Sequence, residues 1–459
     1  MHLFPPELDI APDEGFTPEK DIFGRKEFAD QLTRVVRALE DPTVLLLDGK
    51  WGTGKTVFIK MWLGELRKLD VPTIYFDAFA NDYHEDAFLT LAGEIVAKAE
   101  QLNPRRQATL DKFKVGAFQV AKALGRASIK IGIRAASAGL LSGEELTAGL
   151  KITTDAARVV GDETAKAVDD LIKERLDSHS ADKEAFERFK EALTALAVAL
   201  NETESNDAGT VSKENLIFVI DELDRCRPSF SLELLEKIKH FFAVPRVIFV
   251  LASSREQLEQ AVKFSYGDID CRTYLEKFYH LRMSFPAGRR DRPDGSVAKY
   301  LGHLLAEIPP GSTDYGFVIS MMAAVRPLSL RTLERVYSYL KIVTMSMRQG
   351  SAFFPEVISV LCLLKVIEPD LYDAARKGML SFDALNAAVR FGHWRNPNSQ
   401  EVDDHVSQRI AGIWRVILGE PNVDDQQRVQ QDHRFATFRA SGDVMTYYCE
   451  LIDCFAFPG

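Results

Sequence analysis

Short apolar runs bounded by polar residues or glycine recur through the first 286 residues of the chain. Their length and their β-branched and aromatic content are typical of buried strands. Five such runs are present, at Thr43–Asp48, Thr73–Asp77, Leu216–Asp221, Val247–Ala252 and Tyr279–Phe285. Several are flanked by segments with apolar residues at helical spacing, so the pattern predicts a parallel α/β sheet that is buried on both faces.

The interval between the second and third predicted strands is far longer than one crossover helix requires. It runs from about residue 87 to residue 212, is rich in Ala, Lys and Glu, and keeps helical periodicity. After Pro286 the pattern is irregularly helical, and the sequence AGRRDRPDG provides a break. We therefore expect an N-terminal extension over residues 1–20, an α/β domain over residues 21–286 with an inserted helical subdomain, and a helical C-terminal domain over residues 287–459.

Composition and charge narrow the range of functions. The chain has 459 residues, of which 46% are hydrophobic, and a formal net charge of -10. That charge repels phosphate backbones, so contact with nucleic acid would need a local basic patch. The five cysteines contain no CxxC pair, no window reaches the ~18–20 consecutive apolar residues of a membrane span, and the N-terminus lacks a secretory signal pattern. We expect a cytoplasmic protein with reduced thiols.

The residues Gly49 to Thr56, GKWGTGKT, match the phosphate-loop pattern GxxxxGK[ST]. Glycines let the backbone bend around a phosphate, and the following helix presents its positive N-terminal end to the same anion. Lys55 would bridge the β- and γ-phosphates of ATP, and the Thr56 hydroxyl would bind Mg²⁺. The strand before the loop and the helix after it favour this interpretation over an ordinary glycine turn. The predicted nucleotide-binding residues are Gly49, Lys50, Trp51, Gly52, Thr53, Gly54, Lys55, Thr56 and Val57.

The third predicted strand delivers two acidic residues, Asp221 and Glu222, to the edge of the sheet where ligands bind in open α/β folds. Asp221 would hold Mg²⁺, and Glu222 could orient and deprotonate the attacking water. An isolated acidic pair of this kind could instead cap the next helix. Together with the phosphate loop, the pair predicts catalytic residues Lys55, Asp221 and Glu222 and metal ligands Thr56 and Asp221.

Segments around these motifs resemble the KAP family of P-loop NTPases. The extended acidic motif DELDRCRP, from Asp221 to Pro228, and the segment YLEKF, from Tyr274 to Phe278, are similar to two signatures of that family. The segments DIFGRKEFADQL and FDAFANDYHEDAF also look like family segments, so the resemblance covers about residues 18–286. It implies an ATPase that uses ATP and Mg²⁺, with the strand order 5-1-4-3-2 of the similar AAA-like and STAND ATPases.

The chain departs from the family pattern in three places. Many members carry membrane helices between the two motifs, whereas the insertion here has no spanning segment, which implies a peripheral or wholly soluble role. Ser254-Arg255 stands where the family often has Asp before a basic residue, which weakens a sensor assignment there. Glu222 stands where the family often has Asp, and its longer side chain favours hydrolysis.

The charge that develops on the γ-phosphate is commonly met by an arginine, supplied in cis or by a neighbouring subunit. Arg225 could instead pair with a carboxylate and anchor the acidic loop, and Arg331 could lie on a solvated helix face. Ser253 and Ser254 follow the fourth strand, where a hydroxyl could contact the γ-phosphate or water, or cap the next helix. The sequence does not rank the four arginine candidates, which are Arg225, Arg255, Arg272 and Arg331.

Basic residues recur every four positions in part of the insertion, among small apolar residues, and would form a stripe along one helix face. It comprises Lys122, Arg126, Lys130 and Arg134. The stripe could meet nucleic acid, a membrane surface or an acidic subunit, and a solvated helix face is the simpler explanation.

Three functions are consistent with these patterns. The first is an ATPase motor or switch that rearranges a homo-oligomer or a partner protein. For this function the resemblance implies a partner from the same operon and a place in bacterial anti-phage defence. The second is a signalling scaffold that binds ATP and turns over slowly. The third, a P-loop kinase, is disfavoured by the acidic pair and by the lack of an acceptor motif.

Overall fold

A computed structural model describes most of the chain. The described residues are 5, 8–84, 87–102, 107–125, 187–200, 214–239, 243–286, 296–306, 313–326, 328–347, 352–394, 404–430, 432–437 and 443–453.

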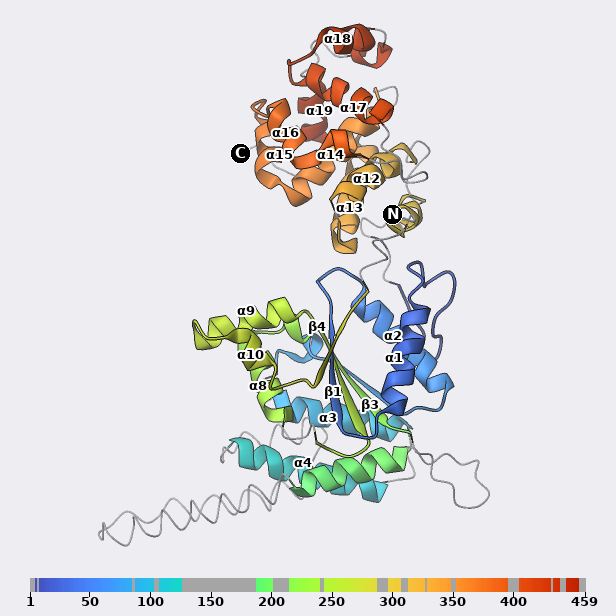
Figure 1. The fold of residues 1–459 in the computed structure, drawn as a ribbon, viewed down its shortest axis with the longest axis vertical. Coiled ribbons are helices and arrows are strands. Elements are labelled where there is room, and N and C mark those ends of the chain that lie inside the picture. The colour runs from blue at the N-terminus through green and yellow to red at the C-terminus, as the bar shows by residue number, and fades with distance from the viewer. Residues whose placement is uncertain are drawn as a thin grey trace, which may run out of the picture.

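Five parallel strands form one sheet in the order β2-β3-β4-β1-β5 (Figure 1), which confirms the predicted order 5-1-4-3-2. The strands are β1 (Thr43–Asp48), β2 (Thr73–Asp77), β3 (Leu216–Asp221), β4 (Val247–Ser253) and β5 (Leu281–Ser284). β4 continues one residue beyond its predicted end. β5 is shorter than predicted because it is an edge strand that pairs only with β1 over four residues.

Helices cover both faces of this sheet. Successive strand residues point to opposite faces, so Val44 and Leu46 of β1 pack on one side and Leu45 and Leu47 on the other. One side is covered by α1 (Lys26–Ala38) and α2 (Lys55–Lys68). The other side is covered by α3 (Ala87–Leu102), α4 (Gln107–Gly125), α8 (Pro228–Ile238) and α9 (Arg255–Tyr266), together with a helix over residues 187–200.

The described part of the insertion between β2 and β3 is helical. The ring of Phe189 packs between those of Phe88 and Phe113, at centroid distances of 5.4 and 5.0 Å, so the helix over residues 187–200 is joined to α3 and α4. The basic stripe predicted at Lys122, Arg126, Lys130 and Arg134 lies outside the residues whose side chains are described.

The described residues after β5 are mainly helical (Figure 1). Their buried apolar side chains form a cluster of their own, from Leu301 to Ile452. Trp394 and Trp414 are fully buried in it. Within the described residues of the chain, no helix is long and apolar enough to cross a bilayer. The helices are α11 (Ser296–Leu305), α12 (Thr313–Val325), α13 (Leu330–Ser346), α14 (Pro355–Ile367), α15 (Pro369–Arg376), α16 (Phe382–Val389), α17 (Asp404–Ile417), α18 (Val423–Gln430) and α19 (Asp443–Ile452).

Candidate nucleotide site

The loop between β1 and α2 wraps around the side chain of Lys55. Gly52 and Gly54 have φ angles of 69° and 81°, which other residues adopt only with strain, so the sequence places glycine where the bend requires it. The Lys55 ammonium group donates to the backbone carbonyls of Gly49 and Lys50. Lys55 is 8% exposed, and this burial lowers the pKa of its ammonium group. The loop therefore holds a cation inside a ring of backbone at the start of α2.

The acidic pair lies directly opposite this loop, because only β4 separates β3 from β1 in the sheet. The Thr56 hydroxyl donates a hydrogen bond of 3.1 Å to Oε1 of Glu222. Asp221 is 1% exposed, and burial, together with the charge of Glu222, raises the pKa of Asp221 to about 6. The structure thus brings together Lys55, Thr56, Asp221 and Glu222, which the sequence separates by more than 160 residues.

Tyr75 also belongs to this site, although no motif in the sequence marks it. Its hydroxyl donates to Oδ2 of Asp221 at 3.2 Å, while the backbone N–H of Glu222 donates to Oδ1 at 2.8 Å. Both oxygens of the buried carboxylate are therefore held in place. Tyr75 lies inside the apolar run of β2, where an aromatic residue is expected as part of the core.

Glu222 has a left-handed backbone, with a φ angle of 58°, and this costs roughly 1–3 kcal/mol for a residue other than glycine. Its carboxylate forms an ion pair of 2.6 Å with Nη1 of Arg225, and the glutamate side chain is 12% exposed. In the structure Arg225 therefore pairs with a carboxylate, which was one of the two roles considered for it. The left-handed turn lets Asp221 and Glu222 both face the phosphate loop.

The fold places only some of the other arginine candidates at the pocket described below. Arg255 pairs with Glu259 on α9 at 3.1 Å, and Arg272, on α10 (Cys271–Leu275), lies 3.8 Å from Glu276 on its exposed surface. Arg225 and Arg331 line the pocket described below, whereas Arg255 and Arg272 do not.

Ser253 and Ser254 are both buried, and neither lines that pocket. The Ser253 hydroxyl has no hydrogen-bond partner within the described residues. Ser254 precedes α9, but its hydroxyl makes no capping bond, and its backbone N–H donates to Oδ2 of Asp224 at 2.8 Å. Asp224 also accepts a bond of 2.6 Å from the Trp51 indole, so it links the phosphate loop to the end of β4.

A pocket of about 1010 Å³ opens between the phosphate loop and the C-terminal helices. Its lining includes residues 50–57, the acids Asp77, Asp221, Glu222 and Asp224, and side chains from α11 and α13. Pockets for small molecules usually have volumes of about 300–1,000 Å³, so a nucleoside triphosphate fits this space.

Arg25, the residue directly before α1, lies in the wall of the pocket. It is 7% exposed, and its guanidinium lies 4.7 and 4.5 Å from the ring centroids of Phe23 and Phe285. Within the described residues Nε has no hydrogen-bond partner, and Nη2 reaches only the Pro286 carbonyl, at 3.5 Å. Burial lowers the pKa of Arg25 to about 10. A buried cation without an ion pair is suited to an anionic ligand.

The first residues of α13 contact the phosphate loop directly. The backbone N–H of Leu330 donates to the carbonyl of Gly52 at 2.9 Å. A Cβ atom on Gly52 would lie 3.1 Å from Cβ of Arg331 and from Oγ of Ser329. The loop is therefore packed against the C-terminal helices at its tightest bend.

The chemistry of these groups suits Mg²⁺. The cation prefers oxygen ligands and usually binds through one or two carboxylates, with phosphate oxygens of the substrate completing the shell. The buried Asp221 carboxylate, with its raised pKa, would gain from a nearby positive charge. The Thr56 hydroxyl lies beside the same acids. Within the described residues, no group of three or more Cys, His, Asp or Glu is placed to hold a metal ion.

The model of the KAP family P-loop domain matches residues 25–292. No curated protein matches the chain significantly. The matched range contains the whole sheet, the phosphate loop and the acidic pair.

Proposed function

The chain belongs to the KAP family of P-loop proteins, and on this premise we propose that it is an ATPase that hydrolyses ATP with Mg²⁺ in the pocket at the carboxyl edge of the sheet. The observation that carries the proposal is the hydrogen bond of 3.1 Å between Thr56 and Glu222. It places the end of the phosphate loop within reach of two acidic side chains.

The residues of the phosphate loop, from Gly49 to Val57, bind the triphosphate. Lys55 exchanges its bonds to backbone carbonyls for bonds to the β- and γ-phosphates. Glu222 accepts the proton of the attacking water as general base. Arg225 and Arg331 both line the pocket, but Arg225 pairs with Glu222, so Arg331 is the predicted arginine that would meet the charge of the γ-phosphate.

Thr56 and Asp221 would hold Mg²⁺, which when bound neutralises charge on the phosphate oxygens. Tyr75 and the N–H of Glu222 fix the orientation of Asp221.

We further propose that the ATPase acts as a motor or switch on an oligomer of this chain or on a partner protein. Residues 21–286 would form the ATPase domain and residues 287–459 a helical lid or interaction domain. The hydrogen bond between Leu330 and Gly52 supports a lid role for the C-terminal domain, because it joins the phosphate loop to the C-terminal helices. A role in bacterial anti-phage defence rests on the family resemblance.

The ion pair between Arg225 and Glu222 favours one alternative, a scaffold that binds ATP and hydrolyses it slowly. The Glu222 carboxylate would have to part from Arg225 before it could contact the attacking water, and this step would slow turnover.

An ATPase assay on the wild type, Lys55→Ala and Glu222→Gln distinguishes these functions. For the ATPase we expect Lys55→Ala to lose ATP binding and Glu222→Gln to bind ATP without hydrolysing it. Phosphate release would then fall by about 10²-fold or more in both variants. A wild type that binds ATP and releases almost no phosphate supports the scaffold. A wild type that does not bind ATP refutes both.

A further inference from the structure

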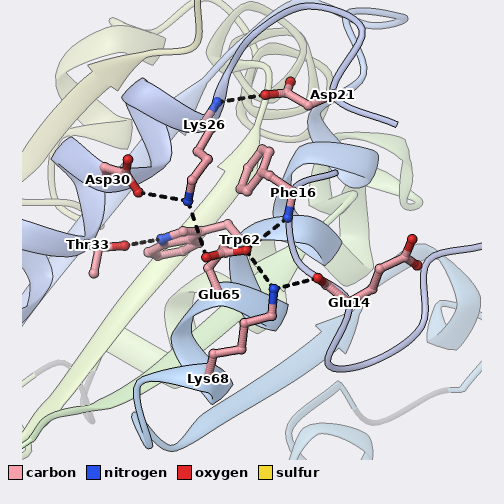
Figure 2. Close-up of polar contacts among 9 residues, drawn as sticks. All are labelled: Glu14, Phe16, Asp21, Lys26, Asp30, Thr33, Trp62, Glu65 and Lys68. Carbon is pink, nitrogen blue, oxygen red and sulfur yellow. Dashed lines mark hydrogen bonds and ion pairs between the residues drawn. The ribbon is translucent and has the colours of Figure 1, made fainter. Parts of the chain in front are cut away.

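The N-terminal residues 8–23, here called the strap, contact α2 at Glu14 and Phe16, which Figure 2 shows beside Glu65 and Lys68. Glu65 of α2 is the centre of the attachment. It accepts bonds from the Phe16 N–H and the Lys68 ammonium group, both at 3.0 Å, and from the Lys26 ammonium group at 3.3 Å. Lys68 also donates to the carbonyl of Glu14 at 2.6 Å. The strap is therefore bound along the second half of the helix that begins with the phosphate loop.

Two glycines allow the strap to approach α2 closely. A Cβ atom on Gly64 would lie 2.5 Å from the backbone nitrogen of Gly15 and 3.0 Å from its Cα. Gly15 has a φ of 73°, and a Cβ atom there would meet the carboxylate of Glu65. A methyl group on Gly64 would have to displace the strap, since the atoms it meets belong to the strap backbone.

The two ends of the strap reach the nucleotide pocket. Leu8, Ile22 and Phe23 line it, and Tyr300 and Leu304 of α11 line it as well. The rings of Phe23 and Tyr300 lie 6.1 Å apart, so the strap and α11 meet at the pocket wall. The strap and α11 therefore supply aromatic and aliphatic side chains to the pocket wall, in addition to the polar side chains of Lys20, Asp21 and His303.

The pocket and the strap follow the same face of α2. Val57, Lys60 and Met61 line the pocket, and Gly64 is the next residue on that face at helical spacing. At 1.5 Å per residue, Gly64 lies about 13 Å along the axis from Lys55. That span is comparable with a nucleoside triphosphate whose phosphates sit at Lys55.

We propose that the strap and α11 form the binding site for the base and ribose of the nucleotide, and that close packing of Gly15 on Gly64 sets the position of this site. The inference rests on the proposed function, because the triphosphate must occupy the phosphate loop. A base gains from apolar and aromatic contacts, which Phe23, Tyr300 and Leu304 offer.

Calorimetric titration of the full chain with Mg-ATP and with Mg-tripolyphosphate tests the proposal, because tripolyphosphate has no base or ribose. Gly64→Ala displaces the strap, although alanine favours the helix itself. Glu65→Ala loosens the strap by a second route. Gly392→Ala is the control, since a Cβ atom there would meet nothing within 4 Å. We expect both strap variants to bind Mg-ATP about tenfold more weakly, with tripolyphosphate affinity within about twofold of the wild type.

Two outcomes would overturn the proposal. Equal losses for ATP and tripolyphosphate would make the strap a support of the phosphate loop, and unchanged ATP affinity would place the base elsewhere. Failure of the wild type to bind either ligand would instead refute the proposed function.

Discussion

Replacement of Arg25 by methionine should stabilise the protein without nucleotide and weaken its response to ATP. Arg25 is 7% exposed and sits between the rings of Phe23 and Phe285. Burial lowers its pKa well below the ordinary value of an arginine, to about 10, although the charge of Asp21 partly offsets this. At about 1.36 kcal/mol per pKa unit, the charged guanidinium costs the folded state about 3 kcal/mol.

The sign of the effect follows from the direction of the pKa shift. At pH 7 the group is charged in both the folded and the unfolded chain, because this pH lies below both pKa values, so the full cost applies. Methionine removes the cost and keeps most of the apolar contact, but it loses two ring contacts worth about 0.5–1 kcal/mol each. The net gain is about 1–2 kcal/mol, or a rise in Tm of about 2–4 °C for a domain of this size.

The opposite effect is expected with ligand. A charge-assisted hydrogen bond to phosphate contributes about 1.5–3 kcal/mol, so Arg25→Met should weaken ATP binding about 10- to 100-fold. Scanning calorimetry with and without Mg-ATP measures both effects. Arg331→Met is the control for the first, because Arg331 lines the same pocket but is exposed and should give no gain in Tm. A lower Tm for Arg25→Met without nucleotide, or an unchanged shift with Mg-ATP, would show the reasoning to be wrong.

Three further changes have defined outcomes. Gly52→Ala should lower Tm and weaken ATP binding, because its φ of 69° is strained by about 1–2 kcal/mol for alanine and its Cβ would press on Ser329 and Arg331; calorimetry and ATP titration measure this. Tyr75→Phe should raise the Mg²⁺ concentration for half-maximal hydrolysis about fivefold, since a hydrogen bond of about 1 kcal/mol to Asp221 is lost; an unchanged Mg²⁺ dependence would count against this role. EDTA should abolish hydrolysis, and added Mg²⁺ should restore it in a phosphate-release assay; activity that persists in EDTA would contradict a role for Thr56 and Asp221 as metal ligands.

The sheet was predictable because its central strands β1, β3 and β4 each carry a clear signal. A parallel strand buried on both faces is a continuous apolar run, and the runs that end at Asp48 and Asp221 also carry the motifs that place them at one edge of the sheet. The end of β5 was harder to predict. β5 is an edge strand and mostly exposed, so its hydrophobicity does not mark its ends. The predicted strand therefore ran from Tyr279 to Phe285, beyond the four residues that pair with β1.

Site residues were predictable only where a motif fixes them. Arg25 and Tyr75 enter the site through contacts with distant parts of the chain, the first with Phe285 and the second with Asp221. Neither contact can be recognised from the neighbouring sequence. An arginine before a helix is common on a protein surface, and a tyrosine inside a strand is common in a core. The four candidate arginines could be separated only once the fold showed which of them line the pocket.

The bond from Leu330 to the Gly52 carbonyl has a mechanical consequence. Leu330 is the first residue of α13, a helix of 17 residues, which extends about 25 Å from the phosphate loop. A rod of that length amplifies small rotations at its base. Tilting α13 by about 5° would carry its far end, at Ser346, through about 2 Å, which is enough to change how its neighbours α14 and α19 pack.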